Sequence, residues 1–209
     1  YRDMCLNKIA IPFATRKFKT PYPGGYVKEP HIGMHKNVVS FDLASLYPSL
    51  IVQYNMSPET IINGKVISTS VNKMLDKHPI ERSDSECVTT TGQYYKTNET
   101  GLMPRIVQGL YTERVVFKKK MIKAQQELQK IDPLDKQAVY NLERNLNRYQ
   151  NEQMSIKILL NSLYGAMGSQ YFRFFDQRIA ESITITGQLT IKWAEKKINT
   201  VLTRYLETG

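Results

Sequence analysis

Apolar residues recur with a helical period over a long stretch in the second half of the chain. From Pro104 they fall close to 3.6 residues apart, first as far as Ile131 and again after Pro133. The first run comprises Ile106, Leu110, Phe117, Met121, Leu128 and Ile131, and the second comprises Val139, Leu142, Leu146, Tyr149, Ile156, Leu160 and Leu163. Such spacing places one apolar stripe on each of two helices. Two long helices joined by a tight turn predict an antiparallel helical hairpin.

Residues that start or stop helices mark the ends of this pattern. Asp132 can cap a helix, and Pro133 can open the next one because a first turn does not need the N–H that proline lacks. Gly165 is expected to end the second helix. A third helix is expected over about 176–206, with its apolar side packed under the sheet that carries Asp42.

A different pattern occupies residues 38–51, VVSFDLASLYPSLI. The run Val38–Phe41 is rich in β-branched and aromatic residues, which favours a buried strand, and it ends at Asp42. Tyr47-Pro48 predicts a turn and a helix start. Ligands of α/β layers lie at the carboxyl ends of strands, and helix N-termini attract phosphate. A divalent cation between Asp42 and a phosphate is therefore predicted. The alternative is a surface aspartate after an ordinary core strand.

Turn signals separate the remaining apolar segments. Tyr22-Pro23-Gly24-Gly25 predicts a tight turn that brings the backbone close to whatever lies above it. Further along, Asn63-Gly64 between apolar flanks is a hairpin signal. The segment Cys87–Thr90 is expected to pair with Tyr94–Lys96 across Thr91-Gly92 as another hairpin.

Cations gather on the predicted helical hairpin. Arg114 and Lys118 are four residues apart on the first helix, and Lys157, Asn161 and Tyr164 share one stripe of the second. Both groups belong near the base of the hairpin, where they could converge on one anion. Several cations aimed at one place are costly unless a polyanion such as a triphosphate binds there. The alternative is a coiled coil with a solvated basic face.

The overall charge agrees with an anionic partner. The 209 residues carry a net charge of +10 and are 41% hydrophobic, enough to bury a core, and a polyanion such as nucleic acid is the commonest partner of so basic a chain. No apolar stretch approaches the roughly 20 residues of a membrane span, and no signal peptide is visible. Cys5 and Cys87 are too few for a disulfide scaffold or a zinc site, so reduced thiols and a cytoplasmic location are expected. A basic but unspecialised protein is the alternative.

Two stretches carry a resemblance to a known family. DLASLYPSLI, residues 42–51, resembles motif A of the family B (polymerase-α-like) DNA polymerases, D-x-x-S-L-Y-P-S-I. KILLNSLYG, residues 157–165, resembles their motif B, K-x-x-x-N-S-x-Y-G. The two stand in the family's order and about a hundred residues apart, and the resemblance covers nearly the whole chain. The neighbouring SPETI and YGAMGSQYFRFFD are most similar to polymerases of T-even-type bacteriophages, which implies a host-cell cytoplasm.

The resemblance implies an α+β fold. It consists of a partial polymerase palm, an antiparallel sheet with packed helices, and a long antiparallel helical hairpin that forms the fingers. The expected divisions are a lead-in at 1–20, a first part of the palm at 21–103, the fingers at 104–169 and a second part of the palm at 170–209.

The family's motifs also imply a role for each matching residue. Asp42 would be the catalytic carboxylate and would bind two Mg²⁺ ions, with Mn²⁺ as the alternative, together with the carbonyl of Leu43. Backbone N–H groups of Ser45, Leu46 and Tyr47 would hold the triphosphate, and the ring of Tyr47 would exclude a 2′-hydroxyl. The side chains on the triphosphate would be Arg114, Lys118, Lys157 and Asn161, and the DNA contacts would come from Tyr22, Gly24, Gly25, Tyr164 and Gly165.

The expected reaction is extension of a primer on template DNA by deoxynucleotides, through two-metal phosphoryl transfer. The family's second aspartate belongs to motif C, a Y-G-D-T-D-S hairpin, and neither that motif nor the thumb has a match before Gly209. The chain is therefore expected to be inactive alone and to need a second polypeptide or a C-terminal palm and thumb segment. It would be a piece of a longer enzyme or one subunit of a split polymerase. The alternatives are a non-catalytic DNA- or nucleotide-binding module with the same fold, and a purely structural helical hairpin.

Overall fold

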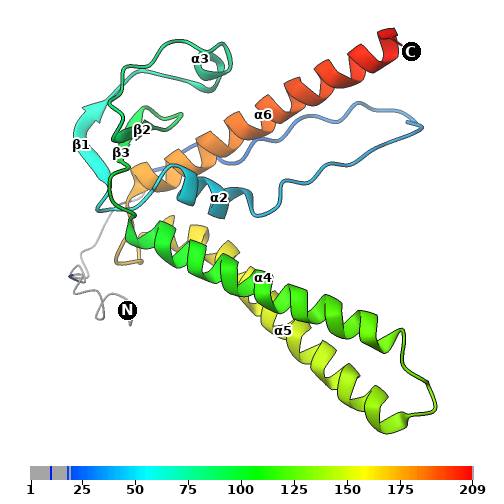
Figure 1. The fold of residues 1–209 in the computed structure, drawn as a ribbon. Helices are drawn as coiled ribbons and strands as arrows, with labels where there is room; N and C mark the ends of the chain where they lie inside the picture. The colour runs from blue at the N-terminus through cyan, green and yellow to red at the C-terminus, as the bar shows by residue number, and fades with distance from the viewer. Residues whose placement is uncertain (1–9, 11–17, 19, 209) are drawn as a thin grey trace.

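The computed structural model describes residues 10, 18 and 20–208, so most of the predicted lead-in at 1–20 lies outside the described residues. A helical hairpin, a small antiparallel sheet and one further long helix meet around a short central helix (Figure 1). The fold is therefore mixed, with an antiparallel sheet and packed helices, as predicted. None of the helices in the described part of the chain has a stretch long and apolar enough to cross a membrane.

The helical hairpin is formed by α4 (Leu102–Leu128) and α5 (Lys136–Met167), which lie antiparallel along one another (Figure 1). This confirms the hairpin predicted from the apolar period. Its second helix starts later than predicted, because the cap is Asp135, whose carboxylate accepts a hydrogen bond of 3.1 Å from the N–H of Ala138. Asp132 instead accepts from the N–H of Leu134 inside the connecting turn.

The end of α5 also differs from the prediction. Gly165 lies inside the helix, which continues to Met167 and is capped by Gly168. Met167 is buried in the core, so the last turn of the helix gains apolar contacts that favour its extension.

The sheet is formed by β1 (Ile61–Val66), β2 (Glu86–Val88) and β3 (Gln93–Lys96), in the order β1-β3-β2, with antiparallel pairing throughout. Cys87 pairs with Tyr95, which confirms the predicted second hairpin. The predicted turn at Asn63-Gly64 is wrong, because β1 runs through it. Gly64 has a positive φ of 77°, and the register with β3 shifts along this strand. A glycine that interrupts a strand pattern can produce such an irregularity instead of a turn.

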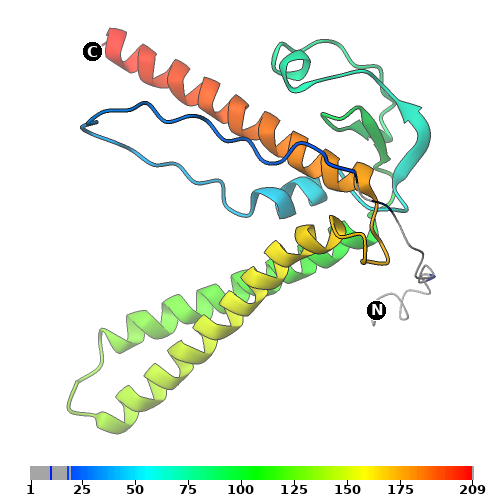
Figure 2. The ribbon, with the colours of Figure 1, turned by 180° about the vertical axis from the view of Figure 1, so that it is seen from behind.

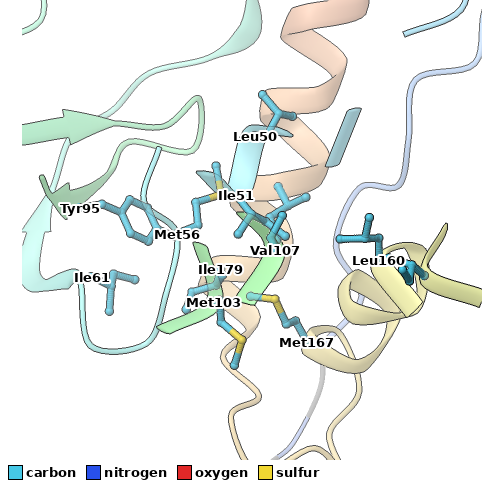
Figure 3. Close-up of a cluster of buried hydrophobic side chains, with 12 residues drawn as sticks. Leu50, Ile51, Met56, Ile61, Tyr95, Met103, Val107, Leu160, Met167 and Ile179 are labelled. Carbon is cyan, nitrogen blue, oxygen red and sulfur yellow. The ribbon is translucent and has the colours of Figure 1, made fainter. Parts of the chain in front are cut away.

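The core forms where α2 (Leu46–Gln53) packs against α4, α5 and α6 (Gln177–Thr208). Figure 3 shows the buried cluster, in which side chains of α2 and α6 meet those of the hairpin's base and of the sheet. Its members are Leu50, Ile51, Met56, Ile61, Tyr95, Met103, Val107, Ile156, Leu160, Met167, Ile179 and Ile183. The base of the hairpin is thus fixed to the helix that follows Asp42.

A buried turn after α2 ties this helix to the start of α4. Asn55 is 8% exposed, and its amide donates to the carbonyls of Lys96 (2.6 Å) and Glu99 (2.7 Å) while its carbonyl oxygen accepts from the N–H of Gly101 (2.9 Å). The next two N–H groups of α4 donate to Glu59 and Ser57. The first N–H groups of a helix have no acceptor inside it, so this turn supplies the cap of α4.

The segment 26–45 is a long loop that runs out along α6 and returns to α2 (Figures 1 and 2). The strand predicted at Val38–Phe41 is therefore wrong: Val38, Val39 and Phe41 are 76%, 72% and 65% exposed. A strand requires a neighbour for its backbone hydrogen bonds, and no strand among the described residues pairs with this segment.

The expectation that α6 packs under a sheet carrying Asp42 is wrong as well. The sheet is built from residues 61–96 and meets α6 near its start, where the hydroxyl groups of Thr91 and Ser182 lie 2.7 Å apart. The later part of α6 leaves apolar side chains exposed, among them Leu202 and Tyr205. A five-residue helix, α3 (Val71–Leu75), lies in the connection between β1 and β2 and contacts α6.

Candidate nucleotide and nucleic-acid site

Three tyrosines from separate parts of the chain meet where α2, α5 and α6 converge. The rings of Tyr47 and Tyr164 are tilted by 44° with their centroids 4.6 Å apart, and Tyr22 makes a side-chain hydrogen bond to Tyr164. We call Tyr22, Tyr47 and Tyr164 the tyrosine cluster. It joins the predicted Tyr22–Gly25 turn to the two sequence motifs that contain Tyr47 and Tyr164. The structure therefore brings these three predicted segments together.

Hydrogen bonds from α6 hold the Tyr22–Gly25 turn in place. The N–H of Thr20 donates to the side-chain oxygen of Gln177 (2.9 Å), and the side-chain amide of Gln188 donates to the carbonyl of Gly24 (2.7 Å). Further out, Lys192 lies 4.9 Å from the centre of the Tyr26 ring. The turn is thus fastened to α6 at several points, and its glycines permit the close approach that these contacts need.

The surroundings of Tyr22 and Tyr47 raise the pKa of both hydroxyl groups. Burial, together with the hydrogen bond to Tyr164, raises the pKa of Tyr22 to about 12. Burial also raises the pKa of Tyr47, with a smaller contribution from Tyr164. Tyr22 and Tyr47 are therefore neutral at physiological pH, and their rings and hydroxyl groups are suited to stacking and hydrogen bonding rather than to ion pairing.

Asp42 lies in the loop that leads into α2, and both Asp42 and Leu43 are exposed. Ser45, the residue before the helix, adopts the left-handed conformation with φ 53° and ψ 45°. That conformation is unfavourable for a residue with a side chain, and such strain concentrates at functional sites. It lets the chain turn sharply from Asp42 into α2.

The first turn of α2 contains backbone N–H groups that the helix itself does not satisfy. Ser49 donates to the carbonyl of Ser45 (2.9 Å), and Pro48 has no N–H. The N–H groups of Leu46 and Tyr47 therefore have no acceptor inside the helix. Helix N-termini of this kind bind phosphate groups.

The predicted cationic side chains lie on the two arms of the hairpin. Arg114 is half-buried, and its Nε atom is buried without a hydrogen-bond partner within the described part of the chain. Lys118, Lys157 and Asn161 are exposed. Arg114 stands twelve residues after the start of α4 and Lys157 ten residues before the end of α5, which is about 18 and 15 Å along the two helices. They lie at similar heights above the base, where Met103 and Met167 share the core (Figure 3).

The donors available for a metal ion are few but chemically suitable. No cluster of three or more His, Cys, Asp or Glu residues occurs among the residues that the structure describes. The carboxylate of Asp42 and the carbonyl of Leu43 are hard oxygen donors, which Mg²⁺ prefers. Magnesium is commonly held by one or two carboxylates together with substrate phosphates and water, so this pair fits part of a magnesium shell.

A cleft of about 570 Å³ opens beside the tyrosine cluster. It is lined by Thr20 and Pro21, next to the Tyr22–Gly25 turn, and by Gly165 and the segment 168–171 at the end of α5. Gly168 lies close to the turn, since a Cβ added there would be 3.1 Å from the hydroxyl oxygen of Tyr22. The cleft thus runs between two of the segments that were predicted to contact DNA.

Sequence reasoning missed the contribution of α6 to this site. Gln177 and Gln188 hold the turn, and a Cβ added to Gly187 would lie 2.8 Å from the ring of Tyr47. A glycine inside an otherwise helical pattern was the available signal, because it is unfavourable there unless close packing requires it.

Comparisons with known proteins cover almost all of the chain. Residues 3–208 match the family model of DNA polymerase family B. The chain is 33% identical to the DNA-directed DNA polymerase of Escherichia phage RB69 and 30% identical to that of Enterobacteria phage T4, over 94% and 95% of its length. It is 33% identical, over 85% of its length, to a DNA polymerase of Thermococcus gorgonarius. These alignments cover 25%, 26% and 19% of the relatives, so the chain spans about a quarter of the phage proteins that it matches.

Proposed function

Because the chain belongs to DNA polymerase family B, we propose that it forms the nucleotide-binding part of a DNA-directed DNA polymerase that extends a primer on a DNA template in the cytoplasm. The observation that carries this proposal is the tyrosine cluster. It joins a turn predicted to touch the template, the segment that follows Asp42, and the helix that carries Lys157 and Asn161.

In this proposal Asp42 and the carbonyl of Leu43 hold two divalent metal ions, Mg²⁺ or Mn²⁺. When bound, the metals neutralise phosphate charge and activate the primer 3′-hydroxyl. Asp42 is exposed and therefore accessible to metal ions, and the left-handed Ser45 lies between it and the start of α2. Phosphoryl transfer of this kind depends on positioning and charge neutralisation rather than on a covalent protein intermediate.

The triphosphate of the incoming nucleotide would be bound from two sides. The N–H groups of Ser45, Leu46 and Tyr47 face it at the start of α2. Four side chains of the hairpin approach from the other side, namely Arg114, Lys118, Lys157 and Asn161. The buried and unpartnered Nε of Arg114 supports this assignment, because a buried charged donor is costly until it meets an anion.

The sugar and the template strand would lie against the tyrosine cluster. The ring of Tyr47 would exclude a 2′-hydroxyl by contact, so that the site selects deoxyribose. Tyr164 and Gly165 would meet the nascent base pair, and Tyr22, Gly24 and Gly25 would contact the template. The cleft beside the cluster supports this path, because it is lined by Gly165 and by Thr20 and Pro21, which precede Tyr22 in the chain.

The corresponding divisions are a first part of the palm at 21–103, fingers at 104–169 and a second part of the palm at 170–209. A two-metal site needs at least two carboxylates, and Asp42 supplies one. We therefore infer that these residues act together with further palm and thumb polypeptide, on the same chain or on a separate one, and that they do not polymerise DNA alone.

Primer extension tests this proposal. The 209-residue chain is assayed with primer-template, deoxynucleotides and Mg²⁺, first alone and then mixed with a polypeptide carrying the remaining palm and thumb of a phage relative. We expect extension only in the mixture, and none when Asp42→Asn replaces the parent chain. Extension by the chain alone would contradict the need for a second carboxylate from elsewhere. DNA binding without extension in either case would instead indicate a non-catalytic binding module.

A further inference from the structure

Gly187 lies ten residues into α6, where a glycine is less favourable than an alanine. Its backbone is in close contact with the ring of Tyr47. A Cβ added to Gly187 would lie 2.8 Å from Cε1 and 3.5 Å from Cδ1 of that ring, and 3.8 Å from Cδ2 of Leu46. The first distance is too short for two carbon atoms, so any side chain at this position would displace the ring.

The ring of Tyr47 also has close neighbours at its hydroxyl end and on the side of Tyr164. A Cβ added to Gly25 would lie 3.3 Å from its hydroxyl oxygen, and the ring of Tyr164 lies 4.6 Å away between centroids. The helix behind the ring is fixed too, because Leu50 and Ile51 of α2 are buried in the core. Gly187, Gly25 and Tyr164 together form a seat for the ring.

We propose that Gly187 is a positioning residue that sets where the Tyr47 ring stands and thereby how well the site rejects a 2′-hydroxyl. This inference rests on the proposed function. A side chain that excludes the 2′-hydroxyl by steric contact distinguishes a hydroxyl group from a hydrogen atom only if its position is fixed to within a fraction of an ångström. Adding a methyl group at Gly187 displaces the ring from this position, and the site then selects deoxynucleotides over ribonucleotides less well.

Another helical glycine provides a matched control. Gly109 lies in α4, and a Cβ added there would meet nothing within 4 Å. Gly109→Ala therefore makes the same chemical change in a helix without touching the tyrosine cluster. It also removes a helix-weakening glycine, so it serves as a stabilising background in which to make Gly187→Ala.

The experiment measures incorporation of single deoxynucleotides and ribonucleotides by the 209-residue chain, mixed with the palm and thumb polypeptide described above. We expect Gly187→Ala to raise the KM for the deoxynucleotide while changing kcat less. We also expect it to lower the ratio of kcat/KM for deoxynucleotide over ribonucleotide at least about threefold, which is within the range of coupling between residues in contact. The same substitution in a Tyr47→Ala background should leave that ratio unchanged, because the ring that it displaces is absent.

Each result bears on the inference. An unchanged ratio in a folded Gly187→Ala variant, or an equal change in the Tyr47→Ala background, would overturn the role of Gly187 and leave the proposed function intact. A mixture of parent proteins that incorporates neither nucleotide would overturn the proposed function and this inference with it. Circular dichroism confirms folding, and the Gly109→Ala background allows the measurement if Gly187→Ala alone is too unstable.

Discussion

The buried amide of Asn55 gives a prediction about how the hairpin is fixed to the helix after Asp42. Asn55→Ala removes three hydrogen bonds, to Lys96, Glu99 and Gly101. It leaves two carbonyl groups and the N–H at the cap of α4 without their partner. The substitution also places alanine at φ 50°, in the left-handed conformation that asparagine tolerates better.

The expected loss of stability follows from these contacts. A hydrogen bond in a protein contributes about 1 kcal/mol net, so the three bonds account for about 3 kcal/mol of the free energy of unfolding. The left-handed backbone adds about 1 kcal/mol for alanine. Asn55→Gly loses the same hydrogen bonds but accepts this backbone, so it should be less destabilising than Asn55→Ala by about 1 kcal/mol. A domain of ordinary stability would lose a large part of its 5–15 kcal/mol in either case.

Urea unfolding followed by far-ultraviolet circular dichroism measures these losses for the 209-residue chain. Asn145→Ala is a suitable control, since Asn145 is exposed on α5 and its replacement should change stability by less than about 0.5 kcal/mol. A loss below about 1 kcal/mol for Asn55→Ala would refute the reasoning, because it would mean that water or rearranged backbone replaces all three partners. Equal losses for the alanine and glycine variants would refute the backbone contribution.

Three further outcomes are expected. Asp42→Asn should lower primer extension in the completed polymerase at least about 1,000-fold, since metal binding contributes several kcal/mol to the transition state; its stability in urea should be unchanged, because Asp42 is exposed. The free energy of unfolding should fall between pH 10 and about 12, because Tyr22 loses its proton near pH 10 in the unfolded chain but only near pH 12 in the folded one. Tyr22→Phe should reduce this fall, and an unchanged pH profile would contradict the raised pKa of Tyr22. Gly92→Ala should lower the free energy of unfolding by more than about 3 kcal/mol, since its Cβ would lie 1.9 Å from the carbonyl oxygen of Ile67. Gly64→Ala, which has a similar positive φ but open space around it, should lower it by about 1 kcal/mol. Similar losses for both variants in urea unfolding would refute the steric argument.

The helical hairpin could be predicted because its signal is long and local. The apolar period runs through most of both helices, and the chain between them is short. The strand expected at Val38–Phe41 failed for the opposite reason, because a strand depends on a neighbour that sequence patterns within the segment do not reveal. The turn expected at Asn63-Gly64 failed because a glycine with positive φ can interrupt the register of a strand as well as form a turn.

In the candidate site, too, local sequence motifs predicted some residues, whereas residues that act through distant segments were missed. The residues of the tyrosine cluster could be chosen from motifs, and the structure brings them together. Gly187 and Asn55 could not be chosen in this way, because their roles depend on segments tens or more than a hundred residues away. Their contacts exist only once the whole fold has formed.

The hydrogen bonds between α6 and the segment around the Tyr22–Gly25 turn also constrain the order in which contacts can form during folding. The partners Thr20 and Gln177 are 157 residues apart in the chain, and Gly24 and Gln188 are 164 apart. If the ribosome adds 5–20 residues per second, the residues of α6 that bind the turn are synthesised roughly 8–30 s after the turn itself. The hairpin, whose contacts are closer in sequence, can form in that interval. Loop closure over such a span is entropically costly, so the contacts that hold the turn predicted to face the template are expected to form late, after the local contacts of the hairpin.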